Sequence, residues 1–265
     1  MTKYFFAKKN KYKYSGNVVT LGKQDIGVTQ KEIYDIANLP HSSIDKSITD
    51  EEYLRLLGFS KVDSLEYSTM DGATIAHDLN SPLPEELHGK FDWIIDGGTL
   101  EHCFNVKEFM TTMVKLLKPG GHILHMNPSQ GSSNHGLFNF QPTFYYSFYG
   151  SNGFTSMECD LLEIHVQPKE IFTNKDVKGK VIPVKNYNNL AYFSGFPTYN
   201  AFHAVKPMGD TNKEVTIPIQ EFYYRIFKEK EKVGGGMIAD DLYKQIRGDV
   251  DENTVEGILK NAYWL

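Results

Sequence analysis

Three acidic side chains, Glu66, Asp78 and Asp96, each end or directly follow a short apolar run. The runs have the length of buried strands, and helical segments separate most of them. Alternating strands and helices predict a mostly parallel sheet, in which the carboxyl ends of the strands meet along one edge. The carboxylates would then lie near one another and could bind a ligand with separate hydroxyl and amino donors.

The elements that position these acids follow from the hydrophobic pattern. Strands are predicted at 17–22, 62–66, 73–77, 91–96, 123–126, 157–166 and 199–205, which gives a seven-stranded sheet. Helices that cover both faces are predicted at 29–38, 51–57, from Thr99 to about Lys118, and at 143–149. Thr29 with Glu32 has the spacing of a capping box, and Asp50 is the expected cap of the second helix.

The two ends of the chain differ from the rest. Residues 1–14 carry five lysines between aromatic residues, and we expect a solvated N-terminal arm rather than a phosphate-binding one. Residues 1–207 are predicted to form one domain, and 208–265 a C-terminal helical extension that serves as a lid or a homodimer contact. Its helices are predicted at 219–232, 238–246 and 253–263, with a glycine hinge at 234–236. The stretch 167–197 has no clear period and is interpreted as an insertion.

Composition excludes several classes of protein. The formal charge is 28 − 33 = −5 with 23% charged residues, which excludes collagen-like and wholly disordered chains. Only three basic residues are arginine, which is unlike a nucleic-acid reader. No apolar run approaches the length of a membrane span or a signal-peptide core. Cys103 and Cys159 are too few for a disulfide framework. We therefore expect a cytoplasmic protein with no nucleic-acid or membrane partner.

Two segments carry a resemblance to a known family. The stretch from Ala73 to His125 contains FDWIIDGGTLEHCFN and LLKPGGHILH, and it resembles the class I S-adenosylmethionine-dependent methyltransferases. The match in element order extends from Asn17 to about Val205. The resemblance implies a Rossmann-like α/β fold and S-adenosylmethionine as the cofactor.

The resemblance also implies roles for individual residues. Glu66 would accept hydrogen bonds from the ribose hydroxyls, and Asp78 from the adenine amino group, with its two neighbours flanking the ring. The first loop departs from the family pattern, because Thr20 stands at the upstream acid and Gln24 at the middle glycine. The implied cofactor-binding set is Gly22, Lys23, Gln24, Glu66, Tyr67, His77, Asp78, Leu79, Asp96, Gly97, Gly98 and Thr99.

Three further residues are candidates for catalysis. His102 is predicted to be the general base, since a neutral imidazole suits proton abstraction near neutral pH. His135 is the second candidate base, in a loop after the fifth strand. Glu101 either assists or only complements a helix N-terminus, and His102 could equally be a packed or surface histidine. His122 and His125 are interpreted as core or edge residues.

Other side chains suggest a pocket or a metal site. Phe138, Phe140 and Tyr146 are candidate walls of an acceptor pocket. Asp96, Glu101 and His102 could offer ligands to a magnesium ion, but a third carboxylate is missing. No metal is included in the predicted site.

The predicted function is methyl transfer to a small polar acceptor. The polar loop at 129–134 and nearby lysines favour O-methylation of a sugar or a nucleotide-linked precursor. N-methylation of a small molecule and a non-catalytic S-adenosylmethionine-binding module are the alternatives. A dehydrogenase lacks support because the middle glycine of its phosphate-binding turn is missing. Nucleobase amino-methylation is disfavoured, because Asp96-Gly97-Gly98-Thr99 stands where its motif would be.

Overall fold

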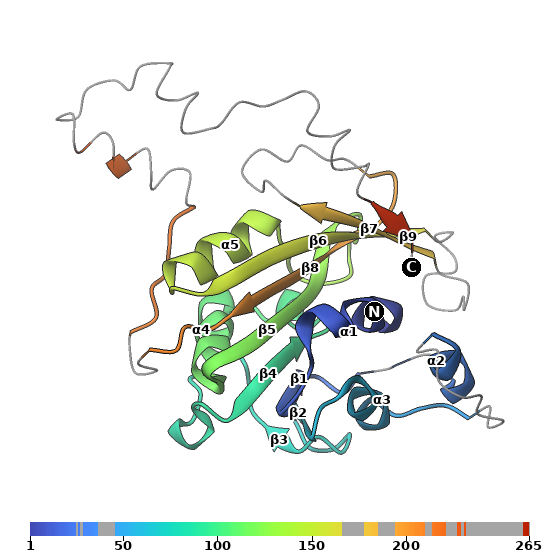
Figure 1. Ribbon diagram of the computed structural model, residues 1–265. Coiled ribbons are helices and arrows are strands. Elements are labelled where there is room, and N and C mark those ends of the chain that lie inside the picture. The colour runs from blue at the N-terminus through green and yellow to red at the C-terminus, as the bar shows by residue number, and fades with distance from the viewer. Residues whose placement is uncertain are drawn as a thin grey trace.

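The computed structural model describes residues 1–24, 26, 29–36, 46–165, 178–184, 194–209, 214–220, 227–228, 231 and 262–264. The predicted hinge and the helix at 238–246 lie outside these residues, as do most of the helices at 219–232 and 253–263. None of the described helices is long and apolar enough to cross a membrane. Figure 1 shows the described elements as coloured ribbon.

The strands form one mixed sheet in the order β3-β2-β1-β4-β5-β8-β6-β7-β9. In that order, β3, β2, β1, β4 and β5 are parallel to one another. Strand β8 pairs antiparallel with β5, and β6, β7 and β9 continue the antiparallel pairing. The bounds are β1 (Asn17–Leu21), β2 (Lys61–Glu66), β3 (Ile75–Ala76), β4 (Phe91–Asp96), β5 (Leu117–Gln130), β6 (Thr155–His165), β7 (Lys178–Val184), β8 (Thr198–Val205) and β9 (Tyr263–Trp264). The predicted Rossmann-like α/β architecture is confirmed.

The described sheet has nine strands rather than the predicted seven. Strand β7 lies in the stretch interpreted as an insertion, where lysines and Pro183 obscure the alternation of a strand. Strand β9 occupies the end of a predicted helix, and its Tyr263 pairs with Val181 of β7. Both additions extend the antiparallel half and leave the parallel half as predicted.

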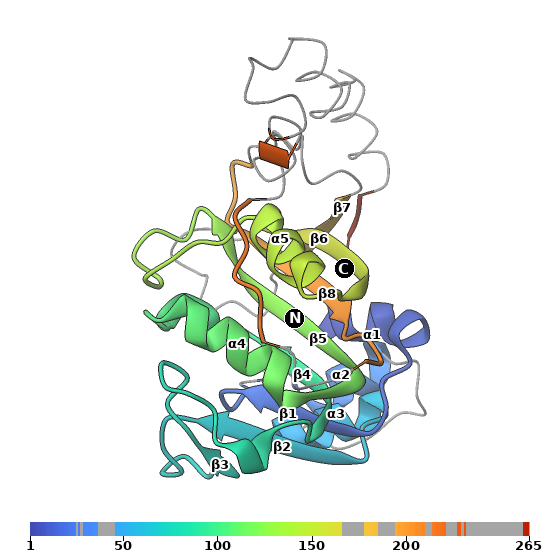
Figure 2. The same cartoon turned by 90° about the vertical axis from the view of Figure 1, so that its left-hand side faces the viewer.

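Helices cover the two faces of the sheet, and each face has its own apolar cluster. Helices α4 (Val106–Leu116) and α5 (Pro142–Ser151) lie on one face, whereas α1 (Thr2–Tyr12) and α3 (Asp50–Leu57) lie on the other (Figures 1 and 2). Helix α2 (Gln30–Ile36) is short and contributes Ile33 to the second cluster. We call these the α4/α5 face and the α1/α3 face.

The expected solvated N-terminal arm is wrong. Helix α1 buries Tyr4, Phe5 and Tyr12, which contribute to the apolar cluster of the α1/α3 face. Lys8 is buried with them and forms an ion pair of 2.5 Å with Asp160 of β6. The aromatic residues recur at helical spacing, so one side of the helix packs on the sheet while other lysines stay exposed.

Helix starts are set by local hydrogen bonds. Thr29 and Glu32 form the predicted capping box, with the Thr29 amide donating to Glu32 over 2.7 Å. The second helix is capped by Thr49 with Glu52, one residue before the predicted Asp50.

The helix predicted from Thr99 begins only at Val106, because the side chain of Asn105 caps it by accepting a hydrogen bond from the Glu108 amide. Residues Leu100–His102 form a separate 3₁₀ turn, η2, which follows β4 after the loop of Gly97, Gly98 and Thr99.

Candidate active site

The first loop folds over the end of β2. Gly22 has φ +78°, which favours glycine, and its amide donates to the carbonyl of Leu65 over 2.9 Å. The amide of Lys23 donates to Oε1 of Glu66 over 2.8 Å. The loop and the acid predicted to share a ligand are therefore in contact.

The side chain of Gln24 holds this loop against the end of β1. Its side-chain amide donates to the carbonyl oxygens of Leu21 and Gly22, over 2.9 and 3.1 Å. The same side chain lies against Gly97, after β4. Gln24 thus joins the first loop to the loop after β4, at the position where the family resemblance implies a glycine.

Asp78 lies after β3, beside the end of β2. The His77 amide donates to the carbonyl of Glu66 over 2.8 Å, which joins the two strand ends. The backbone and side-chain amides of Asn80 donate to Asp78 and hold the pKa of its carboxyl below the ordinary value. Asp78 is therefore ionised and partly exposed at neutral pH.

Two neighbours of these acids differ in exposure. Tyr67 is 80% exposed, so its ring is accessible beside Glu66. Leu79 is buried in the apolar cluster of the α4/α5 face, which leaves it little surface to flank a ring as the resemblance implies. Its apolar side chain is more stable in the core than at a polar rim.

Asp96 does not face the ligand edge, contrary to the expectation. Its side chain is fully buried, and Oδ1 accepts from the Thr99 amide over 2.9 Å. Oδ2 accepts from Nδ1 of His125 over 2.7 Å and from the side-chain amide of Asn127 over 2.9 Å. Because both oxygens already accept hydrogen bonds, Asp96 holds the loop of Gly97, Gly98 and Thr99 in place from the buried side of the loop.

Burial alone would raise the pKa of Asp96. The hydrogen bond and charge of His125 outweigh it, with help from the amides of Thr99 and Asn127, and lower the pKa. Asp96 is thus a buried carboxylate. Thr99 turns its hydroxyl to the carbonyl of Leu21 over 2.9 Å, so the loop after β4 is fixed to the end of β1.

Two tyrosines of α5 complete this network, and sequence reasoning missed them. The hydroxyl of Tyr149 lies 2.6 Å from Nε2 of His125, and that of Tyr145 donates to Asn127 over 2.8 Å. The signal available was the i, i+2 spacing of His125 and Asn127 on one strand face and the i, i+4 spacing of the tyrosines.

The three predicted catalytic residues lie together. Nε2 of His135 is 3.5 Å from Oε1 of Glu101, and Nε2 of His102 is 4.0 Å from it. The two imidazole rings have centroids 5.2 Å apart. Both histidines are exposed, whereas Glu101 is fully buried.

The pKa values of this cluster are shifted by its surroundings. Burial, followed by the charge of Asp96, raises the pKa of Glu101 to about 7. Burial and the neighbouring His135 lower the pKa of His102. His102 is therefore a neutral imidazole at neutral pH, which is the form that accepts a proton.

The loop after β5 is held against η2 by its backbone. The amides of Leu137 and Phe138 donate to the carbonyl of Glu101, over 2.7 and 3.3 Å. Gly136 lies so close that a Cβ there would be 2.8 Å from Cγ of Glu101. These contacts bring His135 to Glu101, although the two are far apart in the sequence.

The predicted aromatic walls separate in the structure. Phe138 packs near Phe140, with ring centroids 6.0 Å apart. Tyr146 is buried and packs against Phe202 of β8. Tyr146 is therefore part of the core rather than an accessible wall.

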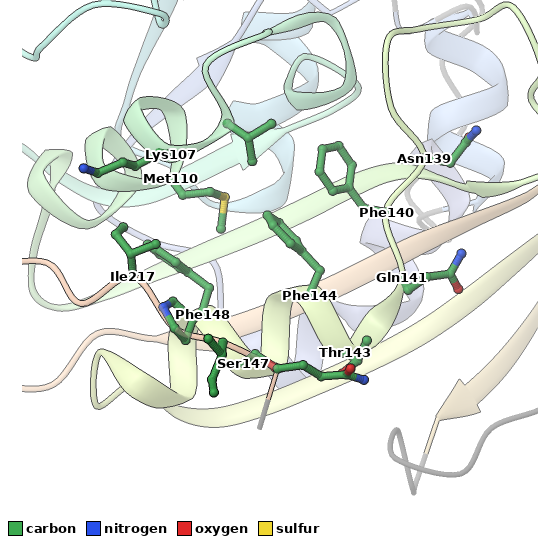
Figure 3. Close-up of a pocket in the computed structure, with 14 residues that line it drawn as sticks. Lys107, Met110, Asn139, Phe140, Gln141, Thr143, Phe144, Ser147, Phe148 and Ile217 are labelled. Carbon is green, nitrogen blue, oxygen red and sulfur yellow. The ribbon is translucent and has the colours of Figure 1, made fainter. Parts of the chain in front are cut away.

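A cavity of about 480 Å³ lies between α4 and α5, and residues 217–220 of the segment 214–220 line one side of it (Figure 3). Asn152 holds this segment through two 2.9 Å hydrogen bonds to the backbone of Thr216. None of the predicted cofactor-binding residues lines the cavity. Its lining is Val106, Lys107, Met110, Asn139, Phe140, Gln141, Thr143, Phe144, Ser147, Phe148, Ile217, Pro218, Ile219 and Gln220.

Comparison with known proteins gives structural likenesses alone. No family model matches the chain, and no curated protein matches its sequence. TehB from Haemophilus influenzae is 14% identical over 76% of this chain, with a TM-score of 0.42. Burkholderia thailandensis 1,6-didemethyltoxoflavin-N1-methyltransferase, solved with S-adenosylhomocysteine, is 12% identical over 78% of each chain, with a TM-score of 0.39.

A third solved structure is the YcgJ protein from Bacillus subtilis, 11% identical over 78% of this chain and 99% of its own, with a TM-score of 0.43. The chain spans 61% of the length of TehB and 47% of the CMeT domain of the citrinin polyketide synthase. Similarity at this level concerns the path of the chain and leaves the reaction open.

Proposed function

We propose that this protein is an S-adenosylmethionine-dependent methyltransferase that acts on a small polar acceptor. The observation that carries the proposal is the polar edge formed by β1, β2 and β3, where Gly22, Glu66 and Asp78 lie side by side. It agrees with the family resemblance in the sequence, although no sequence-level relative supports it.

The donors and acceptors of this edge fit the cofactor. Oε1 of Glu66 is held by the Lys23 amide, and Oε2 accepts no hydrogen bond from a residue in the described ranges. Within those ranges, nothing competes with a ribose hydroxyl for that oxygen. The ionised Asp78, oriented by Asn80, can accept from an amino group. Gly22 lets the backbone approach the methionine end, while Gln24 replaces a glycine there.

The cofactor, when bound, supplies an activated methyl group for in-line displacement. The chain's own residues would orient the acceptor, exclude water and take up the proton. We assign proton acceptance to the cluster of Glu101, His102 and His135, in which the imidazole of His102 is neutral. The polar loop 129–134, beside this cluster, favours a hydroxyl of a sugar or a nucleotide-linked precursor as the acceptor.

Binding of S-adenosylhomocysteine, measured by calorimetry, tests the cofactor site. We expect Glu66→Ala to weaken binding about 10- to 100-fold, because hydrogen bonds to a charged group contribute roughly 1.5–3 kcal/mol. Asp71→Asn is the control, since Asp71 is an exposed acid in the turn between β2 and β3. Its affinity should equal that of the natural chain.

The absence of binding to the natural chain, or equal losses in both variants, would overturn the cofactor assignment. The acceptor is tested separately by transfer of a labelled methyl group to sugar nucleotides, phenols and amines. Labelling of sugar nucleotides supports the proposal. Labelling of amines alone would establish N-methylation instead, and binding without any turnover would establish a non-catalytic module.

A further inference from the structure

The cluster of Glu101, His102 and His135 has the composition of a metal site. Each residue offers one ligand atom, and the three atoms lie within 4.8 Å of one another. Glu101 and His102 come from the turn η2, whereas His135 comes from the loop after β5. Two imidazoles and one carboxylate are a common ligand set for divalent metals in proteins.

The surroundings of its two oxygens orient the carboxylate of Glu101 for this role. Oε2 accepts from the side-chain amide of Asn127 over 3.0 Å, and Asn127 is itself held by Tyr145. Oε1 is buried and accepts no hydrogen bond from any residue that the structure describes. A buried polar atom without a partner is costly, and this one points to the two imidazole nitrogens.

We propose that Glu101, His102 and His135 bind a divalent first-row transition-metal ion, with Zn²⁺ and Co²⁺ as representatives. Imidazole ligands suit these ions, whereas Mg²⁺ and Ca²⁺ prefer oxygen ligands alone. Three protein ligands leave at least one coordination position for water or a substrate oxygen. The ion would satisfy the buried oxygen of Glu101 and offset the negative charge that Asp96 adds nearby.

Small side-chain rotations complete the geometry. Zn–N and Zn–O distances of roughly 2 Å place ligand atoms about 3.3 Å apart, so the widest separation must shrink by about 1.5 Å. The imidazoles can move, since the side chains of His102 and His135 are 48% and 33% exposed. The carboxylate need not move, because Asn127 already orients it as an outer-shell partner would.

Metal binding is measured without cofactor or acceptor, so its outcome is independent of the proposed methyl transfer. The tag-free full-length chain is treated with a chelator, dialysed and titrated with Co²⁺ while visible d–d absorption is recorded. Zn²⁺ then displaces the bound Co²⁺. We expect one ion per chain, with an intense absorption spectrum typical of low coordination number.

Three variants locate the site. Glu101→Gln, His102→Ala and His135→Ala should each weaken Co²⁺ binding by at least about 10-fold, as losses of metal-supporting groups do. His165→Ala is the matched control, because His165 pairs with Glu163 over 2.5 Å elsewhere in the sheet. Its affinity should not change. Circular dichroism verifies that each variant folds, and the two exposed histidines can be replaced even if Glu101→Gln does not fold.

The proposal is overturned if the natural chain binds no stoichiometric Co²⁺ at micromolar concentration. It is also overturned if His102→Ala and His135→Ala bind as tightly as His165→Ala, since the ion would then occupy another place.

Discussion

His122 and His125 lie three residues apart on β5, and their side chains therefore point to opposite faces of the sheet. On the α4/α5 face, His125 is bonded to the buried carboxylate of Asp96 and to Tyr149. On the α1/α3 face, His122 stacks on Trp93 with ring centroids 4.2 Å apart and lies 3.0 Å from Nε2 of His203. The same residue type thus has an ionic environment on one face and an aromatic one on the other.

The aromatic side disfavours charge. Burial lowers the pKa of His122, and burial with the neighbouring His122 lowers the pKa of His203 to about 4. His203 also stacks on Tyr12 of α1, with centroids 4.4 Å apart. No acid in the described residues hydrogen-bonds to either ring, and Glu158 acts on His203 only through its charge.

The two faces of the sheet therefore have different roles: the α4/α5 face holds the loops of the candidate site, and the α1/α3 face stabilises the fold. The ionic network lies beneath the loops that carry Thr99 and Glu101, so it fixes their position. The aromatic stack lies under α1 and fixes that helix to the sheet. Four substitutions test this division, and the tests are ordered by expected effect.

The largest effect is expected from Asp96→Ala. The change leaves His125 and Asn127 without a shared acceptor, and two unsatisfied buried groups at about 1–3 kcal/mol each cost about 2–6 kcal/mol together. The free energy of unfolding in urea should fall by that amount. His122→Phe, the counterpart on the other face, keeps the aromatic stack and should cost less than about 1.5 kcal/mol. Equal losses would show that the two faces do not differ as described.

The second effect is a pH dependence on the aromatic side. The pKa of His203 is about 4 in the folded chain, against 6.5 for an unperturbed histidine. Between these two pH values, His203 binds a proton in the unfolded chain and not in the folded chain. The contribution of neutral His203 to the free energy of unfolding is therefore fully present well above pH 6.5, and it is lost as the pH decreases toward 4. The loss reaches about 3 kcal/mol, at 1.36 kcal/mol per pKa unit.

His203→Phe should remove that component of the pH dependence, because phenylalanine stacks on Tyr12 without titrating. Urea unfolding of both chains at several values between pH 7 and pH 4 measures it. The groups around His203 are His122, Glu158, Lys11 and Tyr12, and all remain in the variant. An unchanged slope in the variant would mean that His203 is not held neutral.

The smallest effect is expected from Tyr149→Phe on the ionic side. The change removes a hydroxyl 2.6 Å from Nε2 of His125 and keeps the packing of the ring. Thermal or urea unfolding should show a loss of about 1–3 kcal/mol, the cost of an unsatisfied buried polar atom. No loss would indicate that His125 does not depend on the tyrosine.

Local patterns predicted much of the parallel half of the sheet. The run FDWIID is apolar and continuous, and β4 occupies those residues because a strand buried on both faces needs such a run. The capping box of Thr29 and Glu32 was also predictable, since its hydrogen bonds connect residues close in sequence. By contrast, β7 contains two lysines and has no clear apolar period, and it becomes a strand by pairing with β6 and β9.

The candidate site could be predicted only in part. The acids at strand ends were identified, and the positions of Glu66 and Asp78 beside the first loop are consistent with ligand contact. The burial of Asp96 was not visible, because a strand-end acid can face water, a ligand or the core. Its partners His125 and Asn127, and the tyrosines that contact these two residues, come from later elements, and no local period connects them to β4.

The sequence by itself determined the strands of the parallel half and the capping box at Thr29, because hydrophobic period and capping act over a few residues. The sequence also predicted catalytic roles for Glu101, His102 and His135, and these stay predictions. Only the tertiary structure decided which acid is buried and that the loop after β5 places His135 against Glu101. Those outcomes depend on packing between distant segments, where desolvation and hydrogen bonding decide whether a charged group faces water, a ligand or a partner.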